Sequence, residues 1–89
     1  MNIVIVGTGY VGLVTGVGFS EQGHKISFID LDSTKIEKLA NKELPFFEPE
    51  LDEYFSNEEN FNRMSFHDNY AGINWDETDI VFILSLIHI

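Results

Sequence analysis

Hydrophobic residues along the chain occur in short runs separated by glycines or by polar segments. Residues 3–6, Ile-Val-Ile-Val, form a continuous β-branched run next to a glycine, which is typical of a strand buried on both faces of a parallel sheet. Residues 25–31 and 79–84 carry two more apolar runs that we expect to be buried strands, and residues 64–66 are long enough for a short strand. The pattern therefore predicts about four strands.

Between these runs the apolar residues follow the spacing of helices. Residues 11–22 are apolar or small and are followed by Gly23, which favours a helix that ends at a glycine in the left-handed conformation. Residues 33–41 also have apolar side chains at helical spacing, and Asp32 or Ser33 is placed to cap the exposed N–H groups. Further along, we expect an extended loop at 44–49, a helix at 50–55, a polar turn at 57–62 and one helical turn at 69–73.

The first predicted helix contains two internal glycines, Gly16 and Gly18. Each of them costs about 1 kcal/mol relative to alanine in a helix interior. We therefore expect close packing of backbone against backbone at both positions.

Strands that alternate with helices predict an α/β fold of the Rossmann-like, doubly wound class, in which an open parallel sheet is built with right-handed crossovers. A complete dinucleotide-binding domain of this class has the strand order 3-2-1-4-5-6. With about four candidate strands, the chain is predicted to form the N-terminal part of such a domain, somewhat more than its first half.

Charge and composition narrow the possible partners. The 89 residues include 15 acidic and 5 basic side chains, for a net charge of −10, and residues 43–89 hold most of the acids with Arg63 as their one base. This charge repels phosphate backbones and anionic lipids, so we expect no nucleic-acid or membrane partner. The absence of cysteine and of a visible signal peptide favours a cytoplasmic protein. The apolar run at 80–89 is about half the roughly 20 residues that a membrane helix needs.

The strongest motif is Gly7-Thr8-Gly9-Tyr10-Val11-Gly12, a GxGxxG that directly follows the first strand and opens the first helix. The first glycine of such a motif permits the tight turn, the second lets the backbone approach a pyrophosphate, and the third lets the helix pack against the strand. The N–H groups and the positive dipole end at the helix start can then hold a diphosphate without a basic side chain.

Asp30 ends the second predicted strand, 21 residues after Gly9. This separation is typical of an acid that hydrogen-bonds a ribose 2′-hydroxyl, and a carboxylate there would repel a 2′-phosphate. The sequence therefore favours NAD as the cofactor, although Lys35 nearby could soften the discrimination. Glycine-rich turns between a strand and a helix also occur without a ligand, which is the alternative interpretation.

Other polar clusters are weaker candidates. The histidines His24, His67 and His88 have no metal-ligand spacing, so we predict no metal site. The serines lack interpretable His and Asp partners, so no catalytic residue is predicted. The acidic run that could suggest a cation site is more typical of a solvated face, and it comprises Glu48, Glu50, Asp52 and Glu53.

On these motifs the chain resembles the UDP-glucose/GDP-mannose dehydrogenases, in the N-terminal segment of those enzymes. The resemblance covers residues 1–83, more weakly over 63–70 and 79–83, and Glu50 stands where the family usually has glycine. The residues that carry it are the stretch GTGYVGLVTG, Gly23-His24, Asp30 with Asp32, Lys35-Ile36, and Pro45 followed by Glu48-Pro49 and Leu51.

The resemblance implies an enzyme that oxidises the C6 hydroxyl of a nucleotide sugar to a carboxylate in two NAD-dependent steps, as a homo-oligomeric parent protein. In that family a cysteine nucleophile and its lysine, asparagine and aspartate helpers lie in a later domain, so no catalytic residue is carried over to this chain. The phosphate turn and the residues beside the adenosine ribose are implied to bind the cofactor, namely Gly7, Thr8, Gly9, Tyr10, Val11, Gly12, Asp30 and Lys35.

We predict a partial NAD-binding domain at residues 1–83 and a tail of foreign origin at residues 84–89, with a natural hydrophobic tail as the alternative. The tail reads Leu-Ser-Leu-Ile-His-Ile, the translation of CTGTCTCTTATACACATC, which resembles a transposase adapter used in sequencing libraries. Two alternative functions stay open: a 3-hydroxyacyl-CoA type of NAD-dependent dehydrogenase, against which Glu48-Pro49 argues, and a non-catalytic module that senses dinucleotides.

Overall fold

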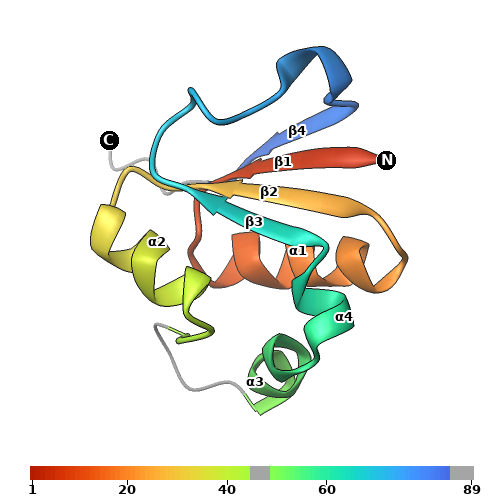
Figure 1. Cartoon of the computed structure of the whole chain (residues 1–89), viewed down its shortest axis with the longest axis vertical. Helices are drawn as coiled ribbons and strands as arrows, with labels where there is room; N and C mark the ends of the chain where they lie inside the picture. The colour runs from red at the N-terminus through yellow and green to blue at the C-terminus, as the bar shows by residue number, and fades with distance from the viewer. Residues whose placement is uncertain (45–48, 85–89) are drawn as a thin grey trace.

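The computed structural model describes residues 1–44 and 49–84, and these form a four-stranded parallel sheet (Figure 1). The strand order is β3-β2-β1-β4, which matches the first four positions of the doubly wound order 3-2-1-4-5-6 and confirms the predicted fold class. The four strands are β1 (Asn2–Val6), β2 (Lys25–Ile29), β3 (Met64–His67) and β4 (Ile80–Ile83).

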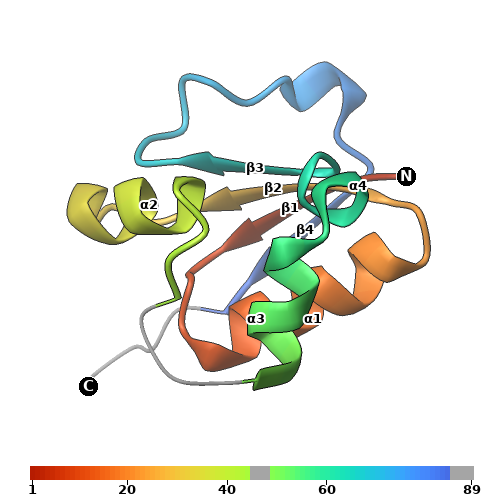
Figure 2. The same ribbon diagram turned by 60° about the horizontal axis from the view of Figure 1, so that its bottom comes forward.

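All four α-helices lie on one face of this sheet, and the connection from β3 to β4 runs over the other face (Figures 1 and 2). Ile5, Leu13 and Phe28 are fully buried in the core between the sheet and the helices. A smaller apolar cluster of Val4, Ile29 and Ile73 lies under the β3–β4 connection. The helices are α1 (Tyr10–Glu21), α2 (Ser33–Ala40), α3 (Pro49–Ser56) and α4 (Glu58–Phe61), and the connection contains a 3₁₀ turn at Trp75–Glu77.

The ends of α1 and α2 agree with the sequence. Gly23 follows α1 with a φ of 93°, the left-handed conformation that suits glycine. The Asp32 side chain accepts a hydrogen bond from the Lys35 N–H at 3.2 Å, so Asp32 is the cap of α2.

The two internal glycines of α1 differ from the expectation and from each other. A Cβ at Gly16 would overlap the Phe28 ring, so α1 does pack closely against the sheet there, but against a side chain rather than a backbone. A Cβ at Gly18 would meet nothing within 4 Å. The prediction of close packing at Gly18 is therefore wrong, because that side of α1 faces open space.

Three segments depart from their predicted structure. The predicted polar turn at 57–62 contains the one-turn helix α4, because the Asn57 side chain caps it by accepting the Asn60 N–H. The helical turn expected at 69–73 is absent from that stretch, and a 3₁₀ turn forms at Trp75–Glu77 instead. The last strand is only half-buried, since Val81 and Ile83 are exposed on the face opposite the helices.

Two predictions fall on residues outside the described ranges. These are the extended loop with Glu48 at 45–48 and, apart from Leu84, the predicted foreign tail. The Leu84 N–H donates a hydrogen bond of 2.8 Å to the Val6 carbonyl oxygen, which extends the pairing of β4 with β1 by one residue. Within the described ranges, no helix is long and apolar enough to span a bilayer.

Candidate functional site

The candidate site lies where β1 and β2 end at the same edge of the sheet. The chain leaves β1 through Gly7, whose backbone φ of 105° is rarely adopted by residues other than glycine. The Gly7 N–H donates a 2.8 Å hydrogen bond to the carbonyl oxygen of Ile29, the last residue of β2. This bond fixes the start of the turn against the neighbouring strand.

Gly9 is the N-cap of α1 and has an extended backbone, with φ −72° and ψ −175°. Its carbonyl oxygen accepts the Leu13 N–H at 3.0 Å, which begins the helical hydrogen bonds. N–H groups in the first turn of a helix have no acceptor within the helix, and Gly9 has no side chain to cap them. A Cβ at Gly9 would also meet nothing within 4 Å, so this end of the helix is open to a ligand.

Gly12 is needed for packing rather than for conformation. A Cβ at this position would overlap the Gly7 carbonyl oxygen, a backbone atom that cannot move independently of the turn. The first turn of α1 therefore lies directly against Gly7, the residue that follows β1.

Asp30 joins the turn to the end of β2. One of its carboxylate oxygens, Oδ2, accepts hydrogen bonds from the Thr8 hydroxyl at 2.7 Å and from the Thr8 N–H at 3.1 Å. The other oxygen, Oδ1, accepts the Asp32 N–H at 3.0 Å. Thr8 is fully buried and Asp30 is partly buried, so the polar groups of Thr8 are satisfied by the carboxylate instead of by water.

Partial burial by itself raises the pKa of the Asp30 carboxyl, but its hydrogen bonds outweigh this effect. The donors are the Asp32 N–H and the hydroxyl and N–H of Thr8, and the Lys35 ammonium adds a weaker attraction, so the pKa is lowered from its ordinary value. The group is consequently a carboxylate at neutral pH, and it can only accept hydrogen bonds.

The lowered pKa predicts how the stability of the fold depends on pH. A carboxyl whose pKa is lower in the folded than in the unfolded chain stabilises the fold above its unfolded pKa of about 3.9. That contribution is lost as the pH falls through the folded pKa. We expect the difference in unfolding free energy between the wild type and Asp30→Asn to be constant above about pH 5 and to shrink below about pH 4. Urea unfolding across this range measures it, and a difference independent of pH would contradict the prediction.

Lys35 approaches the site from α2. Its Nζ lies 3.9 Å from Asp30 Oδ2, and both side chains are about a quarter exposed, at 29% and 21%. The ammonium therefore forms a partly exposed ion pair with the carboxylate, at the long end of the distance range for such pairs.

The arrangement is suited to a ligand that carries both an anion and hydroxyl groups. The open helix start offers N–H donors and a positive dipole end to an anion. A carboxylate has about four lone-pair positions, two on each oxygen. The Asp32 N–H occupies one position on Oδ1, which leaves room there for one ligand hydroxyl. The structure thus brings together the GxGxxG turn, Asp30 and Lys35 as the spacing predicted.

The hydrogen bonds of Thr8 to Asp30 were not anticipated from the sequence. Parallel pairing of β1 with β2 was the available signal, because it places the residues that follow both strands at one edge. A short hydroxyl side chain in the turn can then reach an acid that ends the neighbouring strand.

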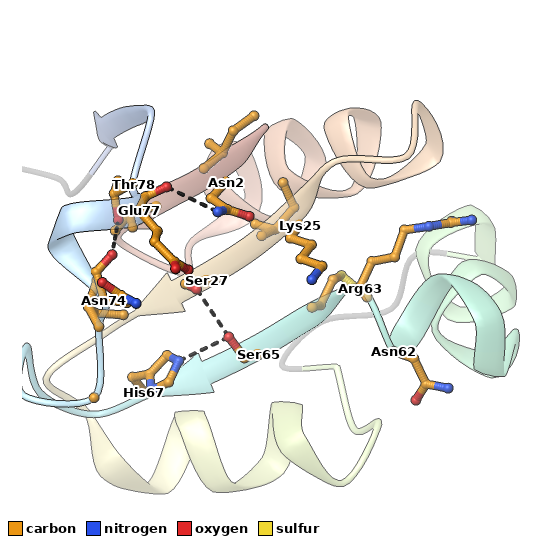
Figure 3. A pocket seen from close by; sticks show the side chains of 16 residues that line it. Asn2, Lys25, Ser27, Asn62, Arg63, Ser65, His67, Asn74, Glu77 and Thr78 are labelled. Atoms are coloured by element: carbon orange, nitrogen blue, oxygen red, sulfur yellow. Dashed lines mark hydrogen bonds between the residues drawn. The ribbon is translucent and has the colours of Figure 1, made fainter.

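A separate cavity of about 390 Å³ lies on the face of the sheet opposite the helices (Figure 3). Ser65 on β3 is hydrogen-bonded to Ser27 at 3.2 Å and to the ring of His67, the last residue of β3, at 3.0 Å. None of the predicted cofactor residues lines this cavity. Among the residues that the structure describes, no group of three acidic or histidine side chains is arranged to hold a metal ion.

Comparison with known proteins finds one family model and several related enzymes. Residues 1–85 match the model of the UDP-glucose/GDP-mannose dehydrogenase family, NAD binding domain. A UDP-glucose 6-dehydrogenase of Bacillus subtilis is 43% identical over 83 residues, which are 93% of this chain and 19% of that protein. A UDP-glucose 6-dehydrogenase of Rickettsia bellii is 42% identical over the same shares of the two chains.

Solved structures agree with this likeness. The ternary complex of GDP-mannose dehydrogenase from Pseudomonas aeruginosa superposes with a TM-score of 0.81 and 31% identity, over 94% of this chain and 19% of that one. The UDP-glucose dehydrogenase of Pyrobaculum islandicum gives a TM-score of 0.79 and 30% identity, again over 94% and 19%. The chain spans about a fifth of the length of these four proteins, 19% of each.

Proposed function

Since the chain belongs to the UDP-glucose/GDP-mannose dehydrogenase family, and to the NAD-binding domain of that family, we propose that it captures NAD and orients the nicotinamide in a nucleotide-sugar dehydrogenase. The observation that carries the proposal is the pair of hydrogen bonds from Thr8 to Asp30, which joins the glycine turn to the acid at the end of β2. The 3-hydroxyacyl-CoA type of dehydrogenase is disfavoured by the family match.

In this proposal the turn and the start of α1 hold the diphosphate of NAD. The N–H groups of the first helical turn point to one place, and Gly9 leaves space for the phosphates to approach the backbone. Asp30 Oδ1 accepts a hydrogen bond from the adenosine ribose, and the Lys35 ammonium lies near the other carboxylate oxygen, Oδ2. The proposed cofactor-binding residues are Gly7, Thr8, Gly9, Tyr10, Val11, Gly12, Asp30 and Lys35.

The charge at Asp30 predicts selectivity for NAD over NADP. A 2′-phosphate on the ribose would lie against a carboxylate that already accepts three hydrogen bonds from the protein and cannot be protonated at neutral pH without losing them. We expect NADP to bind at least about tenfold more weakly than NAD, which is the effect of roughly 1.4 kcal/mol of repulsion and lost hydrogen bonding. Isothermal titration calorimetry of the chain with each dinucleotide tests this, and equal affinities would contradict the role of Asp30.

The whole enzyme is proposed to be a UDP-glucose 6-dehydrogenase that converts UDP-glucose and two NAD⁺ to UDP-glucuronate. The supporting observation is that the relatives that carry this name align with 93% of the chain. The chain contains no cysteine, and the family resemblance assigns the nucleophile to a later domain. We therefore expect the 89-residue chain to bind NAD but to form no NADH with UDP-glucose.

An assay of NADH formation with the chain alone tests whether NAD binding and catalysis reside in different domains. A full-length parent is the positive control. Turnover by the 89-residue chain would contradict it, and absence of NAD binding by the chain would contradict the proposed site. The homo-oligomeric parent and the cytoplasmic location stay predictions.

A further inference from the structure

A groove between α1 and α3 contains two adjoining cavities, of about 220 and 360 Å³. The two helices lie side by side below the sheet (Figure 2). The cavities share Glu21, Glu50 and Tyr54 in their walls, so they form two ends of one surface depression.

The smaller cavity is the apolar end of the groove. Val17 and Leu51 form buried walls, and Val14 is 39% exposed at the rim. Between them Gly18 leaves a notch, because a Cβ there would meet nothing within 4 Å. A glycine inside a helix costs about 1 kcal/mol relative to alanine, and no contact in the described part of the chain requires Gly18.

Tyr54 belongs to the walls of both cavities and is 6% exposed. Its hydroxyl oxygen is buried and has no hydrogen-bond partner. A buried polar group without a partner is costly, and native proteins usually supply one. Tyr54 contributes to the wall that the two cavities share, so a polar ligand group bound there could supply the partner that its hydroxyl lacks.

The charge of the groove is negative. Glu21 and Glu53 contribute carboxylates beside Tyr54, and no basic residue lines either cavity. Arg63 lies two residues after α4, and its guanidinium already contacts Glu59 at 3.5 Å and donates a hydrogen bond to Asn60 Oδ1 at 2.8 Å. A positively charged group is the complement of this surface.

We propose that the groove binds the lysine side chain of a basic polypeptide. The methylenes lie in the notch at Gly18 between Val17 and Leu51, and the ammonium donates to the Tyr54 hydroxyl and to the carboxylates of Glu21 and Glu53. An ammonium is compact and has three donors, which matches this set of three acceptors. A polypeptide is favoured over a free amine because further acids on α3 and α4, outside the cavities, attract additional basic residues; these are Asp52, Glu58 and Glu59. The proposal does not depend on cofactor binding.

The direct test is an NMR titration of the ¹⁵N-labelled chain with the peptide Ac-Gly-Lys-Gly-Lys-Gly-NH₂. We expect saturable amide shifts in the second half of α1 and in α3. The peptide with norleucine in place of each lysine has the same aliphatic chains without the ammonium and should give no shifts there. Cadaverine, a free diamine, should bind at least about tenfold more weakly than the peptide. It lacks a second lysine side chain that can reach the acids outside the cavities. Equal binding of cadaverine, or shifts confined to other elements, overturns the proposal.

Two variants separate the groove from general charge attraction. Gly18→Leu fills the notch without changing the charge, and we expect it to abolish the saturable shifts. Tyr54→Phe removes the unpartnered hydroxyl, so it should raise the melting temperature of the free chain while weakening the peptide about tenfold. A purely structural role of Tyr54 would give the rise in melting temperature alone, and that result overturns the proposal even if Gly18→Leu fails to fold.

A matched pair of charge variants completes the test. Glu21→Gln removes a carboxylate of the groove, and Glu37→Gln removes an exposed carboxylate on α2. We expect the first to weaken the peptide at least about fivefold more than the second, since only the first removes a direct acceptor of the ammonium. Equal losses of peptide affinity in the two variants would mean that binding depends only on the net charge of the chain. That result would overturn the proposal.

Discussion

Gly12→Ala is expected to abolish measurable NAD binding and to lower the free energy of unfolding by about 1–3 kcal/mol. The added Cβ overlaps the Gly7 carbonyl oxygen. The overlap cannot be relieved by a side-chain rotation, because the atom it meets is backbone. Either α1 moves away from the end of β1 or the turn changes its path, and both displace the N–H groups that we propose to hold the diphosphate. Calorimetry with NAD and urea unfolding measure the two effects.

Two other glycines of the same segment provide controls for this substitution. Gly18→Ala places a methyl group in open space within the same helix, so it should stabilise the chain by about 1 kcal/mol and leave NAD affinity unchanged. Gly9→Ala also has space in the free chain, so it should fold normally, but its methyl group occupies the approach of the diphosphate and should weaken NAD. If Gly12→Ala behaves like Gly18→Ala, the close contact at Gly7 does not govern the site.

Asp30→Ala is expected to weaken NAD by roughly 10- to 100-fold, since it removes a charged acceptor for the ribose. The same change leaves the Thr8 hydroxyl, the Thr8 N–H and the Asp32 N–H without their acceptor. Because Thr8 is fully buried, we expect a further loss of about 1–3 kcal/mol in the free energy of unfolding. Calorimetry and urea unfolding of the same preparation give both quantities.

A double variant separates these two consequences of losing Asp30. Thr8→Val in the wild-type background removes the hydroxyl but keeps the ribose acceptor, so it should reduce stability more than NAD affinity. In the Asp30→Ala background the same change should cost less than it does in the wild type, because the hydroxyl has already lost its partner. Unchanged NAD affinity in a folded Asp30→Ala chain would contradict the assigned role of the carboxylate.

The elements with strong local signals were predictable from the sequence. Three of these signals act within a few residues: the β-branched run before Gly7, the glycine after α1 and the cap at Asp32. The structure has the strand, the helix end and the cap at the predicted positions. The relation of Asp30 to the turn also followed, because parallel strands bring the residues beyond their ends to one edge.

The features that depend on tertiary contacts were not predictable in this way. Whether a helical glycine packs closely or faces solvent is decided by the neighbouring element, and so Gly16 and Gly18 differ although their sequence context is alike. The half-buried state of β4 also depends on neighbouring elements. The apolar character of Val81 and Ile83 does not indicate whether another element covers them. The unpartnered hydroxyl of Tyr54 likewise appears only when α3 is placed beside α1.

The hydrogen bonds between Thr8 and Asp30 also bear on how the cofactor associates. They hold Asp30, the proposed ribose acceptor, and the proposed phosphate turn in a fixed arrangement in the free chain, so the entropy of ordering these groups is lost during folding and not during complex formation. Preorganisation of this kind favours a one-step encounter, with an association rate that rises linearly with NAD concentration.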